Sequence, residues 1–344
     1  MFRVLRAFLI SAFFGAGIYL FLFCLSYFIY PTSSYLDVSS HSMFGNSRAN
    51  LCWGRAPLSQ PGKYIVLIGS SSARDGFRPA MMTKDDGIIV HSLCLGGSNI
   101  SAMSRTYDLA KEAMDAQSLD NSIIATAVVY PNFAEDKMAW GEGLTHVDNE
   151  LVRFGFYEIV NDVAISKYSA STRKLLITML RPFFMISTGI DTFKSHVSTL
   201  MQTVYFKIKG MKLKPGLINE KYQKAAMEYW TKIIGRDGGD LAEEQFEKLY
   251  GIANKASADG AQFVLVDLPL PKWHSEKSPF WVDYQERKKK WINLILSLPG
   301  TSYLNMQDLT DKADYVDSAH PTPEAAKKWG ARLRSFIDQN CIGK

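Results

Sequence analysis

The longest apolar segment of the chain lies at its N-terminus. Residues 7–30 include no charged side chain, and a run of ~24 such residues can span a bilayer as a helix. Arg3 and Arg6 precede the run, so the positive-inside rule predicts a cytoplasmic N-terminus. The run is longer than the apolar region of a typical signal peptide, and no clear small-residue cleavage site follows it. We therefore expect a retained signal anchor over residues 1–34 and an extracytoplasmic domain over residues 35–344, with a cleaved signal peptide as the alternative.

Short apolar runs bounded by turn residues follow the anchor and indicate β-strands. They cover residues 64–68, 88–95, 123–130, 262–268 and 301–306. Segments with helical patterns or helix-start signals cover residues 240–258, 283–298 and the chain after Pro321. Strands that alternate with helices are typical of a parallel sheet covered on both faces. The sequence therefore predicts an α/β fold that binds ligands beyond the carboxyl ends of its strands.

A long insertion, residues 133–239, separates the third strand from the fourth. We expect it to be mostly helical. It contains two strongly apolar stretches, residues 175–180 and 183–186, which Arg181-Pro182 interrupts and which are too short to span a membrane. One interpretation is a buried helical hairpin. The other is a surface that lies on the membrane or docks a membrane partner.

The composition fits one large domain attached to the anchor. The chain has 344 residues, of which 47% are hydrophobic, and these are enough to form a sizeable core. The net charge of +5 is mild. One local basic stretch contains Lys207, Lys209, Lys212 and Lys214. It fits a solvated or membrane-facing surface better than a nucleic-acid site, so we expect no nucleic-acid partner.

The cysteines are Cys24, Cys52, Cys94 and Cys341. They are too few for a disulfide scaffold, although one bridge among the last three is allowed outside the cytoplasm.

Two segments far apart in the chain carry candidate chemistry. The first strand breaks into Gly69-Ser70-Ser71-Ser72, where a serine that opens a helix exposes its hydroxyl at the sheet edge. Near the C-terminus, Asp317-Ser-Ala-His320-Pro321 precedes a helix. In a turn, the i, i+3 spacing lets Asp317 reach one ring nitrogen of His320 and fix its tautomer. The two segments together offer a serine nucleophile, a histidine base and an orienting aspartate.

The remaining histidines lack such a setting. They are His41, His91, His146, His196 and His274. His91 lies in a strand and fits a packed core residue. No group of His, Cys, Asp and Glu has convincing metal-ligand spacing, so we expect neither a metal nor a cofactor.

In their order along the chain, these motifs resemble the SGNH (GDSL-like) hydrolase superfamily. Its first block, Gly-Asp-Ser, corresponds to Gly69-Ser70-Ser71, so the resemblance makes Ser71 the nucleophile, with Ser70 in place of the family's Asp. Gly97, after the second strand, takes the place of the glycine whose N–H helps form the oxyanion hole. Asn132 takes the place of the third block's Asn, without that block's flanking Gly and Asp. The resemblance covers about residues 64–130 and 262–344 and implies a flavodoxin-like three-layer fold.

Three features limit the resemblance to membrane-anchored branches of this superfamily. They are the anchor, the Tyr-Pro-Asn-Phe segment at 130–133 and the Pro- and Trp-containing stretch after the fourth strand. They are similar to the D-alanyl transfer proteins of teichoic-acid alanylation, and to membrane-anchored SGNH proteins that O-acetylate exopolysaccharides such as alginate. Members of both groups work beside a multipass membrane-bound O-acyltransferase. The resemblance implies D-alanyl or acetyl transfer to an envelope polysaccharide or teichoic-acid-like acceptor, outside the cytoplasmic (inner) membrane. The alternatives are an SGNH-type esterase or deacylase, and a non-catalytic scaffold for a membrane acyltransferase.

Overall fold

The computed structural model describes residues 2–29, 58, 61–135, 157–160, 163–169, 172, 175–176, 179, 182, 219–234 and 240–341. Its first element is helix α1 (Phe2–Ile29). Within α1, the stretch Arg6–Ser26 has a mean hydropathy of 2.3 and is long and apolar enough to cross a membrane. The structure thus confirms a helix of membrane-spanning length at the predicted place.

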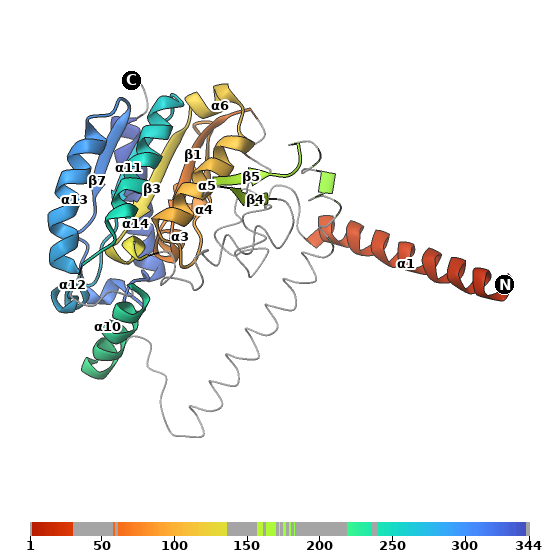
Figure 1. Ribbon diagram of the computed structural model, residues 1–344, viewed down its shortest axis with the longest axis horizontal. Coiled ribbons are helices and arrows are strands. Elements are labelled where there is room, and N and C mark those ends of the chain that lie inside the picture. The colour runs from red at the N-terminus through yellow and green to blue at the C-terminus, as the bar shows by residue number, and fades with distance from the viewer. Residues whose placement is uncertain are drawn as a thin grey trace.

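A five-stranded sheet forms the centre of the domain (Figure 1). Its strands are β1 (Lys63–Gly69), β2 (Ile88–Ser92), β3 (Ile123–Val128), β6 (Gln262–Asp267) and β7 (Thr301–Asn305). All neighbouring pairs are parallel, in the order β2-β1-β3-β6-β7. Counted along the sheet alone, this is the 2-1-3-4-5 order of flavodoxin-like folds. The predicted α/β class and all five predicted strands are confirmed.

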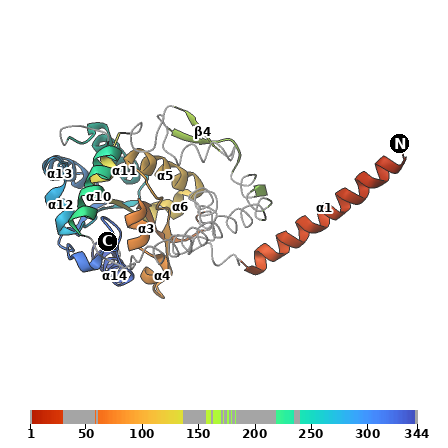
Figure 2. The ribbon, with the colours of Figure 1, turned by 90° about the horizontal axis from the view of Figure 1, so that it is seen from below.

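Helices cover both faces of the sheet, as Figures 1 and 2 show. On one face lie α5 (Ile100–Ala113), α11 (Glu243–Ala258) and α13 (Trp281–Leu296). On the other lie α3 (Ser71–Gly76), α4 (Pro79–Met82) and α14 (Pro323–Asn340). The short helix α6 (Ala116–Asp120) contacts β1. The three central strands β1, β3 and β6 are buried almost throughout, as expected for a parallel sheet between two helical layers, whereas the edge strand β7 is mostly half-buried.

Helix α14 shows how sequence spacing produces this packing. Its buried stripe includes Ala325, Trp329, Leu333 and Ile337, which recur every four residues and therefore share one helix face. Trp329 packs against α3, where a Cβ built on Gly76 would lie 2.3 Å from its ring. A glycine at this position therefore leaves room for the Trp329 ring between α3 and α14.

The insertion differs in part from its prediction. The 3-10 helix η3 (Tyr130–Phe133) leads into it, and its described part contains an antiparallel hairpin of β4 (Tyr157–Val160) and β5 (Val163–Ser166), and helix α10 (Glu220–Ile234). The hairpin was not expected in a mostly helical segment. In the apolar stretch, Leu175 and Met179 are helical and exposed, whereas Phe183 and Phe184 lie outside the described residues. The lysine stretch 207–214 and Cys52 also lie outside them, and Cys94 and Cys341 are buried thiols.

Candidate active site

The turn between β1 and α3 presents Ser71 at the carboxyl edge of the sheet. Ser71 is the first residue of α3, and extended Ser70 precedes it as the N-cap. A Cβ built on Gly69 would lie 2.5 Å from the Cβ of Ala73 and 3.0 Å from the carbonyl oxygen of Ala127. Only glycine fits this close passage from strand to helix, which explains the residue that precedes the serines.

A second turn, formed by residues 317–320, brings the histidine to the same edge. We call it the 317–320 turn. The Asp317 carboxylate closes it, because Oδ1 accepts the backbone N–H groups of Ala319 and His320, both at 2.8 Å. An antiparallel bridge between Tyr315 and Pro321 holds its two ends together. Helix α14 then starts with Thr322 as its N-cap, which fixes the exit of the turn.

The structure joins Ser71, His320 and Asp317 in one hydrogen-bonded chain. His320 Nε2 lies 2.8 Å from Ser71 Oγ, and His320 Nδ1 lies 2.7 Å from Asp317 Oδ2. With the Nδ1 proton on the carboxylate side, Nε2 can accept the hydroxyl proton. Ser71 and His320 are 249 positions apart, and the sheet edge brings them together.

The electrostatics of this chain favour a histidine that can take up a proton. Burial opposes a charge on His320, but the hydrogen bond and the negative charge of Asp317 outweigh it and raise the pKa of the imidazole above its ordinary value. Burial likewise works against the carboxylate of Asp317. Its hydrogen bonds from His320 and from the two backbone N–H groups prevail and lower its pKa.

Gly97 and Asn132 line the same pocket as Ser71 and His320. Gly97 has φ of +79°, a left-handed conformation that favours glycine. The buried side chain of Asn132 is held from both ends: Oδ1 accepts the N–H of Val129 at 2.8 Å, and Nδ2 donates to the carbonyl of Ser98 at 2.8 Å. The structure thus brings all five predicted site residues to one place.

The pocket holds about 290 Å³ of space, close to the lower end of the range for small-molecule sites. One wall comes from the insertion, because α10 contributes Tyr229, Trp230 and Ile233. Helix α10 contacts η3 and α12 (Lys272–Lys277) at this edge of the domain (Figure 1). The sequence analysis did not assign these residues to the site. Amphipathic spacing identifies a helix, but it does not say which edge the helix covers.

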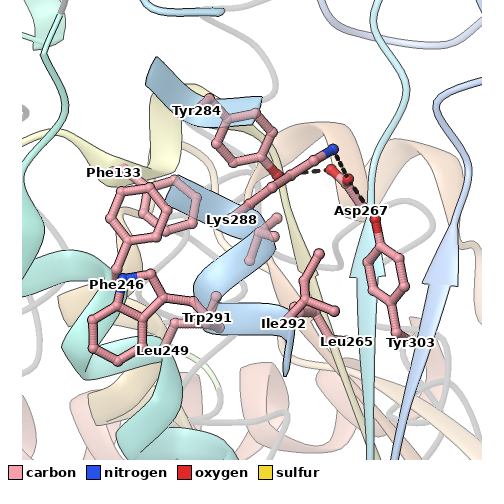
Figure 3. Close-up of a pocket in the computed structure, with 11 residues that line it drawn as sticks. Phe133, Phe246, Leu249, Leu265, Asp267, Tyr284, Lys288, Trp291, Ile292 and Tyr303 are labelled. Atoms are coloured by element: carbon pink, nitrogen blue, oxygen red, sulfur yellow. Dashed lines mark hydrogen bonds and ion pairs between the residues drawn. The ribbon is translucent and has the colours of Figure 1, made fainter. Parts of the chain in front are cut away.

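A separate cluster of charged and polar groups lines a second cavity, which Figure 3 shows and which shares no lining residue with this pocket. Asp267 at the end of β6 accepts hydrogen bonds from Tyr284 (2.7 Å), Lys288 (2.6 Å), Tyr303 (2.9 Å) and Gln307 (3.0 Å). Burial lowers the pKa of Lys288, against the pull of Asp267. The adjoining cavity is only about 10 Å³, room for one water at most. This cluster therefore holds α13 to the sheet and offers no space for a substrate.

Over the part of the chain that the structure describes, no three His, Cys, Asp or Glu side chains are grouped so that they could hold a metal ion. No model of a known protein family matches the chain, and a search of curated proteins finds no match.

Proposed function

We propose that the protein is a serine-dependent acyl-transfer enzyme of the SGNH type, anchored in the cytoplasmic membrane with its active site outside. One observation carries the proposal: the continuous chain from Ser71 Oγ through His320 to Asp317, with bonds of 2.8 and 2.7 Å, among the residues that line one pocket. A hydroxyl, an imidazole and a carboxylate in this arrangement activate a weak nucleophile at neutral pH.

In the proposed reaction, Ser71 Oγ attacks the carbonyl carbon of an acyl ester while His320 Nε2 takes the hydroxyl proton. The tetrahedral intermediate collapses, the C–O bond to the leaving alcohol breaks, and His320 returns the proton to that alcohol. The acyl group is then an ester of Ser71. An acceptor hydroxyl then gives its proton to His320 and attacks this ester. The acyl group becomes an ester of the acceptor, the bond to Ser71 Oγ breaks, and His320 returns the proton to Ser71 Oγ. Asp317 holds the imidazole in the required tautomer and stabilises its charged form.

The pocket also offers donors for the negative oxygen of the intermediate. The backbone N–H groups of Ser71 and Gly97 are two candidates. The side chain of Asn132 is the third, because its amide carries two N–H groups and only one is used by Ser98. Such donors, aimed at the developing charge, supply the largest share of stabilisation in many acyl-transfer reactions.

The acceptor in this proposal is a hydroxyl of an envelope polysaccharide or teichoic-acid-like polymer, and the acyl donor is delivered by a multipass membrane-bound O-acyltransferase. Two features support it: the apolar N-terminal helix of membrane-spanning length and the resemblance of the motifs to membrane-anchored SGNH proteins. With water as acceptor, the same centre is an esterase.

The test uses the full-length protein in detergent and p-nitrophenyl acetate, with and without a hydroxyl-rich polysaccharide as acceptor. We expect release of p-nitrophenol, faster with the acceptor, and nearly complete loss of this activity in Ser71→Ala. Ser70→Ala and Ser72→Ala are matched controls, since these serines flank Ser71 and should keep most activity. Full activity in Ser71→Ala would refute the proposed nucleophile. An inactive wild-type protein would favour the scaffold alternative.

A further inference from the structure

Ser318, in the middle of the 317–320 turn, is held by side chains from two other elements. His274 Nδ1 lies 2.6 Å from the backbone carbonyl oxygen of Ser318. Trp230 Nε1 donates to the hydroxyl of the same serine at 3.1 Å. The carbonyl oxygen can only accept, so His274 Nδ1 carries the proton. Ser318 thus connects the turn with α12, which bears His274, and with α10, which bears Trp230.

The far side of His274 is fixed as well. Its Nε2 meets the hydroxyl of Tyr130 from η3. Because Nδ1 carries the proton of a neutral imidazole, Nε2 accepts and Tyr130 donates. Burial lowers the pKa of His274 to about 4, so the ring stays neutral and keeps this orientation near pH 7. The tyrosine ring stacks on Phe280 at 6.3 Å between centroids, which anchors the pair in the core.

These contacts all reach the 317–320 turn, whose shape sets the positions of Asp317 and His320. Asp317 and His320 lie on either side of Ser318, and a reacting group must be held within fractions of an ångström of its working position. We propose that His274 and Trp230 are positioning residues that hold the 317–320 turn through Ser318. This inference rests on the proposed function. Through Trp230, the end of the 133–239 insertion helps to hold the 317–320 turn in place.

A double-mutant cycle tests the bond to α10. Trp230→Phe and Ser318→Ala each remove the same N–H···O contact, from opposite ends. Ser318→Ala leaves the carbonyl bond to His274 in place, but it also removes the side-chain hydrogen bond between Ser318 and Tyr222 of α10, which Trp230→Phe keeps. We expect each change to lower kcat for p-nitrophenyl acetate about 3- to 10-fold, the range for one hydrogen bond. The double variant should be no slower than the slower single variant. If the kcat losses of the two single variants multiply in the double variant, Trp230 and Ser318 act independently and the inference is wrong.

Two substitutions test the bond from α12. His274→Asn keeps a donor close to the place of Nδ1, whereas His274→Leu keeps none. We expect His274→Leu to lower kcat more than tenfold and His274→Asn to recover most of the rate. A general loss of packing would not give this rescue, and the melting temperature of each variant identifies any unfolding. Equal losses in the two variants at equal melting temperature would overturn the role of His274.

The pH–rate profile supplies a readout that a merely structural role would not move. A loosened turn separates Asp317 from His320 and lowers the pKa of that histidine. The acidic limb of the profile should then move to lower pH in Ser318→Ala and His274→Leu. Asp75 and Arg74 of α3, whose charges also act on His320, are unchanged in both variants. If the wild-type protein is active and both variants keep its pH profile and its kcat, this inference is wrong and the proposed function still stands. If the wild-type protein has no activity, the proposed function itself is wrong.

Discussion

Replacement of Asp317 by asparagine removes the negative charge from the candidate triad and nearly keeps the shape of the side chain. The carboxylate accepts three hydrogen bonds: one from His320 Nδ1 and two from the backbone N–H groups of Ala319 and His320. In Asp317→Asn the amide oxygen can keep the two backbone bonds. The amide nitrogen then faces His320 Nδ1 and donates to it. The ring proton moves to Nε2, which faces Ser71 as a donor and cannot take the serine proton.

The expected loss is large because the wrong tautomer removes the base. In a triad of this geometry it costs about 10⁴-fold in kcat, equivalent to about 5 kcal/mol of barrier. The pKa of His320 should also fall, since the hydrogen bond and the charge of Asp317 are the largest causes that raise it. The acidic limb of the residual activity should therefore lie at lower pH than in the wild-type protein.

The assay is the initial rate of p-nitrophenyl acetate hydrolysis from pH 4 to 9, with the melting temperature as a check on folding. Asp75→Asn is the matched control, because Asp75 acts on His320 through its charge and not through a hydrogen bond to the ring. We expect the control to stay within a few-fold of wild type and to lower the pKa of His320 slightly. A folded Asp317→Asn variant within tenfold of wild type would refute the role given to this carboxylate.

Three further predictions follow from the same structure. Ser71→Ala and His320→Ala should each abolish nearly all ester cleavage, and the double variant should be no worse because triad members act as one unit; multiplied losses would contradict this. Lys288→Met leaves the buried Asp267 without its ion-pair partner and should lower the free energy of unfolding by about 3–5 kcal/mol in urea denaturation, so a loss below about 1 kcal/mol would contradict the structural role of the cluster. A reporter that is active only outside the cytoplasm should be active when fused after Lys344, on a protein that stays with membranes in high salt, whereas a shorter soluble species would show cleavage.

Much of the fold could be predicted because its signals are local. The five core strands are short apolar runs that end in glycine, proline or polar residues, and they are found where these runs predict them. The second strand is shorter than expected. It ends at Ser92, although Leu93 and Leu95 still donate backbone hydrogen bonds to β1, and Gly97 then turns the chain away.

The 317–320 turn was also predictable, because an aspartate three residues before a histidine closes its own loop. The support around it was not. His274 meets Ser318 across 44 positions, Trp230 meets it across 88, and Tyr130 meets His274 across 144. Such pairs leave no spacing pattern in the sequence, so His274 resembled any other histidine. The hairpin in the insertion could not be predicted in this way, because each of its strands has only four residues and, within the described part of the chain, pairs with the other strand alone.

The most direct test of the central claim is to map the site of covalent modification by a fluorophosphonate. Such a reagent phosphonylates only a serine whose hydroxyl is activated by a base, and peptide mass spectrometry locates the adduct. The full-length protein in detergent should carry one adduct, on Ser71, and His320→Ala should prevent it while the protein remains folded. A wild-type protein that stays unmodified, or one modified at another serine, would contradict the claim that Ser71 and His320 form an acyl-transfer centre.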